Sequence, residues 1–135
     1  MRLWSMATAA ILATAILTPG LAIAGDVTTT VKFRAGASSA TLKGTVKGYD
    51  TARYIIGAEA GQVMSVLFSP GNSSCYFNVL PPSGGDAVFN GSSSGNEYSA
   101  NLQSSGNYTI QTYLMRNAAR RNETCKFSLT IEIGG

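Results

Sequence analysis

The chain has 135 residues, enough for one domain, and ten Lys and Arg stand against seven Asp and Glu. It contains no His, which excludes Ser-His-Asp and Cys-His catalytic arrangements and metal sites that use imidazole. The excess of positive charge is too small to indicate a nucleic-acid partner. The carboxylates show no spacing that singles out a glycosidase pair or a calcium loop, so we expect neither an enzyme nor a bound cofactor.

The first 24 residues have the pattern of a secretory signal peptide. Arg2 supplies the positive charge, residues 6–17 form an apolar run, and Ala22-Ile23-Ala24 fits a small-x-small cleavage site. The run is too short to span a bilayer, so we expect no stable membrane insertion. Cleavage after Ala24 would leave residues 25–135 as one domain exported to the periplasm. That domain has 10 − 1 = 9 basic and 7 acidic residues, a net charge of +2.

Short segments with alternating polar and apolar residues follow one another along residues 25–135. Clusters of Gly, Pro, Asn and Ser separate them and predict turns. This pattern is typical of an all-β fold, a small antiparallel sandwich or barrel of eight or nine strands. The expected strands are 31–33, 42–46, 54–58, 63–68, 75–79, 87–90, 97–102, 108–114 and 125–133.

Cys75 and Cys125 are the cysteines of the chain, and each falls in phase with the apolar residues of its expected strand. An even pair in an exported chain predicts a disulfide bond. The alternative is two separately buried thiols. A bond would close a loop of about 50 residues and stabilise the fold by roughly 4 kcal/mol at most.

The stretch 115–124 departs from the strand pattern and carries Arg116, Arg120 and Arg121. Ala118-Ala119 favours a single helical turn with Arg116 and Arg120 on one side. Guanidinium groups pair well with carboxylates, so such a loop could enter an acidic groove on another molecule. The alternative is a solvated loop whose charges aid solubility.

Two polar turns are the other candidate contact regions. Gly106 permits a sharp turn with hydroxyl groups at its tip. An exposed Tyr49 beside a turn would be a good interface anchor. The alternatives are an ordinary turn entering a strand and a tyrosine that covers the core. The candidate residues in these turns are Ser104, Ser105, Gly106, Tyr108, Tyr49 and Asp50.

Three runs in the mature chain are distinctive: Lys47-Gly48-Tyr49-Asp50, Arg116-Asn117-Ala118-Ala119-Arg120-Arg121-Asn122 and, less specific, Ser105-Gly106-Asn107-Tyr108. With them the chain resembles the periplasmic inhibitors of goose-type (g-type) lysozyme from Gram-negative bacteria. The resemblance implies an eight-stranded β-sandwich that blocks the lysozyme active site. It also implies that Ser105-Gly106, Tyr49, Arg116 and Arg120 face the enzyme, which is then the protein partner.

A second resemblance leaves an alternative function open. The Tyr54…Gly61-Gln62 and Ser105-Gly106…Tyr108 pattern is also similar to the small β-sandwich domain at the C-terminus of secreted peptidases. On that interpretation the chain would be a non-catalytic carbohydrate- or envelope-binding module. A structural envelope subunit, completed by a partner along an edge strand, is a further alternative.

Overall fold

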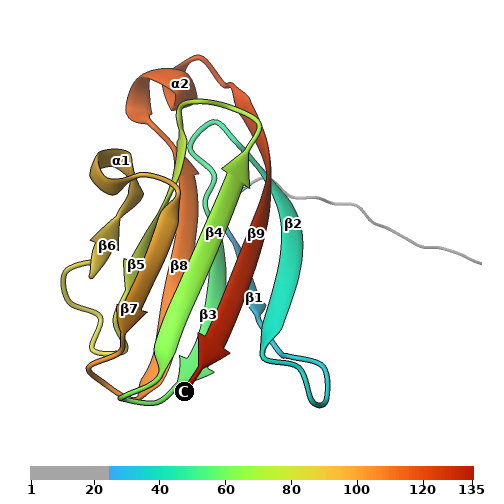
Figure 1. The fold of residues 1–135 in the computed structure, drawn as a ribbon. Coiled ribbons are helices and arrows are strands. Elements are labelled where there is room, and N and C mark those ends of the chain that lie inside the picture. Colours follow the sequence, from blue (N-terminus) through green and yellow to red (C-terminus); the bar gives the residue numbers. More distant parts are fainter. Residues whose placement is uncertain (1–24) are drawn as a thin grey trace, which may run out of the picture.

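The computed structural model describes residues 25–135, which form two β-sheets packed face to face (Figure 1). The expected secretory signal, residues 1–24, lies outside the described residues. The strands are β1 (Val27–Thr30), β2 (Ser39–Lys47), β3 (Ala52–Ala58), β4 (Val63–Pro70), β5 (Cys75–Leu80), β6 (Phe89–Asn90), β7 (Glu97–Asn101), β8 (Gly106–Leu114) and β9 (Thr124–Gly134). Two single-turn helices accompany them, α1 (Gly91–Ser94) and α2 (Arg116–Arg120).

The strand order confirms the predicted β-sandwich. One sheet has the order β1-β3-β8-β5-β6 and the other the order β2-β9-β4-β7. All neighbouring strands pair antiparallel except β1, which lies parallel to β3 with Val27 opposite Ala52. The two sheets remain separate, so the arrangement is a sandwich and not a barrel.

Two of the expected strands differ from the structure. The first strand begins at Val27, before the expected segment 31–33, because its β-branched threonines suit an edge strand while Val31 is already turned into the core. The expected strand 87–90 shortens to two residues. Gly91 approaches the backbone of Phe77 so closely that a Cβ atom would not fit, and the chain turns there into α1.

The core lies between the sheets and follows the alternation seen in the sequence. Buried and partly buried or exposed residues alternate along β3, β5, β8 and β9. Phe68 lies at its centre, with ring centroids 5.3 Å from Phe77 and 5.4 Å from Phe127. Thr112 is a fully buried polar residue, and its hydroxyl donates to the Ala52 carbonyl at 3.0 Å. Burial of this apolar layer fixes how the two sheets face each other.

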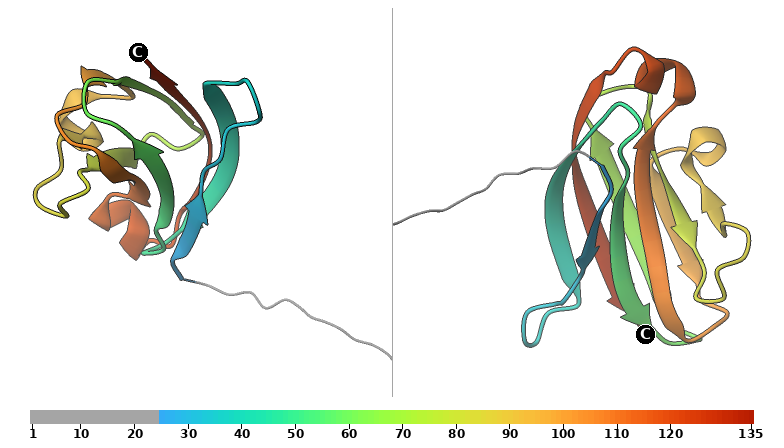
Figure 2. Two further views of the ribbon diagram at one scale, coloured as in Figure 1. Left: turned by 90° about the horizontal axis from the view of Figure 1, so that it is seen from below. Right: turned by 180° about the vertical axis from the view of Figure 1, so that it is seen from behind.

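The strands place their connections at two opposite ends of the sandwich (Figure 2). The end that carries α2, called here the α2 end, contains the connections 48–51, 71–74 and 115–123. Each of these three connections passes from one sheet to the other. The opposite end contains 31–38, 59–62, 81–88 and 102–105. The nine residues of β8 separate the two ends by about 30 Å, at roughly 3.3 Å per residue.

Candidate functional site

The structure divides the predicted contact residues between the two ends. Because β8 begins at Gly106 and ends at Leu114, the Ser-Gly turn and the arginine loop flank the same strand on opposite sides. The expectation that both would form one surface is therefore wrong. Tyr49, Asp50, Arg116, Arg120 and Arg121 lie at the α2 end, and Ser104, Ser105, Gly106 and Tyr108 lie at or next to the opposite end.

At the opposite end the predicted residues hold the loop to the sandwich. Tyr108 is buried, with 2% exposure, and its hydroxyl donates to the Ser104 carbonyl at 2.6 Å. The Ser105 hydroxyl accepts a hydrogen bond from the Ala60 N–H at 2.8 Å. Tyr108 thus belongs to the core and offers no surface to a partner, which corrects its assignment as a contact residue.

At the α2 end the buried face of the helix is made by two small residues. Ala118 and Ala119 are 0% and 3% exposed and pack into the core. Arg116 and Arg120 are four positions apart and both exposed. The helical turn predicted from the sequence is thereby confirmed, and it directs both guanidinium groups away from the core.

The end of α2 is fixed by a Schellman motif. Asn122 has φ of 60°, the left-handed conformation that commonly follows a helix. Its N–H donates to the Ala119 carbonyl at 2.9 Å, and the Glu123 N–H donates to the Ala118 carbonyl at 3.1 Å. The carbonyl groups at the end of the helix therefore have partners, and the path from α2 into β9 is defined.

The turn that presents Tyr49 is joined to this loop. The Asp50 N–H donates to the Lys47 carbonyl at 3.1 Å, which closes a tight turn with Gly48 at φ +61°. The Gly48 N–H donates to the Glu123 carbonyl at 2.9 Å. Tyr49 lies at the tip of the turn and is 68% exposed. The turn that carries Tyr49 and the loop that carries the arginines are thus joined by a backbone hydrogen bond.

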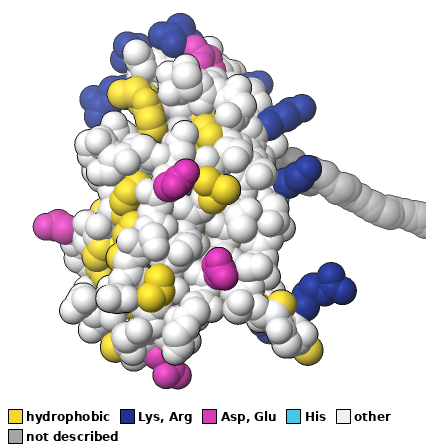
Figure 3. Space-filling model, in the orientation of Figure 1, with side chains coloured by type: hydrophobic (Ala, Val, Ile, Leu, Met, Phe, Trp, Pro, Cys, Tyr) yellow, Lys and Arg dark blue, Asp and Glu magenta, His cyan; other side chains and the backbone are white. Residues whose placement is uncertain are grey.

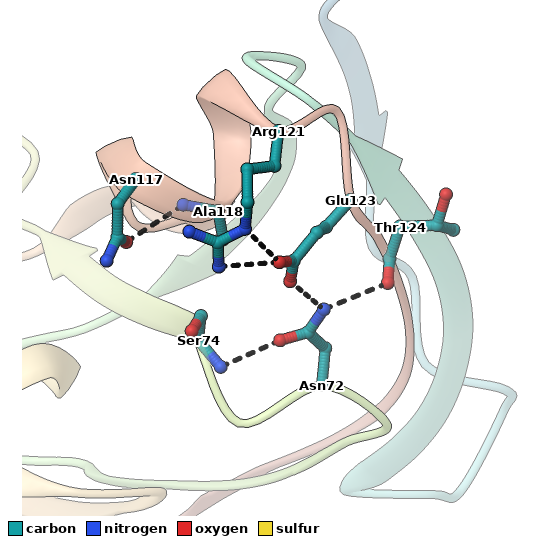
Figure 4. Close-up of polar contacts among 7 residues, drawn as sticks. All are labelled: Asn72, Ser74, Asn117, Ala118, Arg121, Glu123 and Thr124. Carbon is teal, nitrogen blue, oxygen red and sulfur yellow. Dashed lines mark hydrogen bonds and ion pairs between the residues drawn. The ribbon is translucent and has the colours of Figure 1, made fainter.

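A polar network joins a third loop to the same unit (Figure 4). The side-chain amide of Asn72 donates to Glu123 Oε1 at 3.0 Å and to the Thr124 carbonyl at 3.2 Å, while its oxygen accepts from the Ser74 N–H at 2.8 Å. Arg121 donates to Glu123 Oε2 at 2.8 Å. The hydrogen bond from Asn72, followed by that from Arg121, lowers the pKa of the Glu123 carboxyl.

The predicted disulfide is confirmed directly beneath this network. Cys75 follows Ser74 at the start of β5, and Cys125 follows Thr124 near the start of β9, so the bond links the two sheets. The two Cα atoms are 6.3 Å apart, and both cysteines are buried. The Met115 N–H donates to the Ser74 carbonyl at 2.8 Å, which ties the start of the arginine loop to the same point.

In the view of Figure 3 basic side chains lie at the α2 end, along one edge of the sandwich and at the lower right, while acidic side chains lie over the sheet face and at both ends. Among residues 25–135 the ion pairs are Arg53–Asp26 and Arg121–Glu123. Arg116 and Arg120 therefore have no carboxylate within 4.0 Å in that part of the chain. Arg121, although exposed, is engaged by its own chain, so two of the three predicted arginines remain open to a partner's carboxylates.

Asn72 is a residue of this site that sequence analysis missed. It lies in the Pro70-Gly71-Asn72 turn, where Asn is an ordinary turn residue.

Within residues 25–135 no cluster of three or more potential metal-ligating side chains occurs. The helices of that same part of the chain are all too short or too polar to cross a membrane.

The α2 end defines a class of protein: a disulfide-linked β-sandwich with an exposed tyrosine and exposed arginines on loops that hydrogen-bond to one another. Comparison with known proteins identifies the family. No protein-family model matches the chain. A curated Escherichia coli (strain K12) protein, an inhibitor of g-type lysozyme, is 35% identical over 132 residues, covering 92% of this chain and 93% of the relative.

Solved structures similar to this chain belong to the same kind of inhibitor. PliG of Aeromonas hydrophila, a periplasmic inhibitor of g-type lysozyme, is 38% identical with a TM-score of 0.75, and the match covers 82% of this chain and 99% of PliG. PliG of Salmonella Typhimurium is 31% identical with a TM-score of 0.62 and the same coverage. The chain belongs to the family of g-type lysozyme inhibitors.

The resemblance to peptidase domains extends to the fold alone. The pre-peptidase C-terminal domain of a Bacillus anthracis collagenase has a TM-score of 0.52 but only 14% identity, over 84% of this chain and 99% of that domain. The two chains share a sandwich architecture, and such a likeness carries no function with it.

Proposed function

We propose that residues 25–135 form a single domain that inhibits g-type lysozyme in the periplasm, and that the α2 end enters the active-site cleft of the enzyme. Membership of the inhibitor family supports the activity. The choice of surface rests on the exposure of Tyr49, Arg116 and Arg120 at the same end of the sandwich. Neither arginine has an acidic partner in residues 25–135. Residues 1–24 serve export and are removed.

The chemistry of the target explains why these side chains suit it. Lysozymes cleave peptidoglycan with carboxylates in a groove. A guanidinium group donates two parallel hydrogen bonds to a carboxylate, and Arg116 and Arg120 both point away from the core. Tyr49 adds a large amphipathic contact area at low entropic cost. An inhibitor of this kind acts by occupying the cleft and needs no chemistry of its own.

Rigidity of the α2 end favours tight association. The Schellman motif, the Gly48 turn, the Asn72 network and the disulfide fix the backbone before the enzyme arrives, so less conformational entropy is lost on binding. Truncating one partner of a desolvated charge pair typically costs about 2–5 kcal/mol. We therefore expect Arg116→Ala or Arg120→Ala to weaken inhibition by about 30-fold or more.

The opposite end supplies the matched control. Lysis of a cell-wall suspension by g-type lysozyme is followed by turbidity, with each variant titrated against the enzyme. Tyr49→Ala, Arg116→Ala and Arg120→Ala should weaken inhibition while the melting temperature stays within a few degrees, since all three side chains are exposed. Ser105→Arg, which places a bulky group on the opposite end, should leave inhibition unchanged.

The reverse result would reassign the surface. If Ser105→Arg abolished inhibition and the Tyr49 and arginine variants inhibited normally, the Ser-Gly turn would be the part that enters the cleft. Glycan binding by a purified chain that fails to protect cell walls would replace the inhibitor with the carbohydrate-binding alternative.

A further inference from the structure

The first residues after the expected cleavage site lie against the turn that carries Tyr49. The Gly25 N–H donates to Asp50 Oδ1 at 3.0 Å, and the Thr51 N–H donates to Asp26 Oδ1 at 3.1 Å. The Val27 N–H donates to the Thr51 carbonyl at 3.0 Å. The beginning of the mature chain therefore holds the residues that directly follow Tyr49.

An ion pair anchors this segment on its other side. Arg53 donates to Asp26 Oδ2 at 3.0 Å, and the guanidinium group lowers the pKa of the Asp26 carboxyl. From Val27 onward the chain continues as β1 alongside β3. The nitrogen of Gly25 thus lies beside Asp50, in a segment whose hydrogen bonds also involve the side chains of Asp26 and Arg53.

Removal of a leader changes the chemistry of that nitrogen. While residue 24 is attached, Gly25 contributes a neutral amide with a single N–H. Cleavage after Ala24 turns the same nitrogen into an α-ammonium group with a positive charge and three donors. Opposite charges at this separation attract each other, and a charge-assisted hydrogen bond is stronger than one between neutral groups.

We propose that cleavage after Ala24 creates an ion pair between the α-ammonium group of Gly25 and the carboxylate of Asp50, and that this pair positions the Tyr49 turn. The inference deepens the proposed function and rests on it, because Tyr49 matters only if the α2 end binds the enzyme. Asp50 is then a positioning residue, acting through the chain terminus, and not a group that contacts lysozyme. The uncleaved precursor lacks this pair.

The ion pair can be measured without lysozyme. The protein is isolated from the periplasm, its first residue is determined by mass spectrometry, and the pKa of the Gly25 α-amino group is followed by NMR in the native chain and in Asp50→Asn. We expect a pKa higher in the native chain by about 0.2 to 0.7 of a pH unit, the range of an ion pair at a protein surface. Asp86→Asn removes the same charge from the exposed 81–88 loop at the opposite end and should leave this pKa unchanged.

Inhibition then tests the positioning role. A form with one additional alanine before Gly25 moves the ammonium group away from Asp50. Asp50→Asn and this extended form should each inhibit about 1.5- to 5-fold less well than the native chain. Their combination should be no weaker than either alone, because both break the same pair. Asp86→Asn should inhibit normally.

Several results would overturn the proposal. They are a mature terminus other than Gly25, an α-amino pKa that is the same in the native chain and Asp50→Asn, or normal inhibition by both altered forms. A loss of inhibition from Asp50→Asn that persists undiminished in the extended form would show that Asp50 contacts the enzyme directly. Normal inhibition by Tyr49→Ala would instead contradict the proposed binding surface, and the difference in α-amino pKa between the native chain and Asp50→Asn would be unaffected.

Discussion

Removing the Cys75–Cys125 bond should lower the stability of the fold by an amount that follows from the length of the loop it closes. The cysteines are 50 residues apart, for which the chain-entropy relation gives about 4 kcal/mol. A domain of this length unfolds with an entropy near 2.1 cal/mol/K per residue, so each kcal/mol corresponds to about 4 °C. The Cys75→Ala/Cys125→Ala variant should therefore melt below the native chain, by up to about 16 °C.

The assay is thermal unfolding followed by near-ultraviolet circular dichroism, with and without dithiothreitol. The reductant should lower the melting temperature of the native chain and leave that of the double alanine variant unchanged. Thiol titration of the unreduced, denatured protein should find no free thiol. An unchanged melting curve on reduction, together with two titratable thiols before it, would refute the bond and the reasoning built on it.

Three further outcomes are expected. Gly48→Ala should lower the free energy of unfolding, measured in urea, by about 1–3 kcal/mol and weaken inhibition, because Gly48 has φ +61° and a Cβ atom would lie 2.7 Å from Asn122 Oδ1. The control is Gly84→Ala, which should leave inhibition unchanged: Gly84 also has a left-handed backbone, but no atom lies within 4 Å of an added Cβ. The folded-state pKa of Glu123 lies below its ordinary value of 4.5, so the stability that its carboxylate contributes is fully present above pH 4.5 and is lost as the pH falls through the folded pKa. On acidification the native chain should therefore lose more free energy of unfolding than Glu123→Gln, and equal losses would contradict this. The association rate with g-type lysozyme should fall with rising salt, as stopped-flow mixing would show, and less steeply in Arg116→Gln/Arg120→Gln; equal slopes would remove these charges from the encounter.

The alternation of polar and apolar side chains predicted much of the fold from the sequence. Residues 125–133 alternate without interruption and become the central part of β9, and the cysteines lie in the phase that the structure buries. The sequence also predicted the helical turn at Ala118-Ala119, with Arg116 and Arg120 on one side. These predictions succeeded because they depend on local periodicity and on burial alone.

The site was less predictable, although part of the evidence was in the sequence. Tyr108 has the same phase as Ile110 and Thr112, both buried, so its burial follows from the alternation already used for β8. The Ser-Gly turn precedes that strand and the arginine loop follows it, and a straight strand of nine residues sets its two ends apart. The network of Asn72 depends on which loops become neighbours, and neighbouring loops are determined by strand order, which no local pattern specifies.

Because the two ends of the sandwich are far apart, a label can be attached at one end without touching the other. The connection between β5 and β6 contains Gly84 and Gly85, is exposed, and lies at the end remote from α2. In the proposed binding mode, a fluorophore or an immobilisation tag attached there would face away from the enzyme. Surface-attached molecules would then present their α2 ends to solution in a common orientation, suited to capturing and counting lysozyme molecules one at a time.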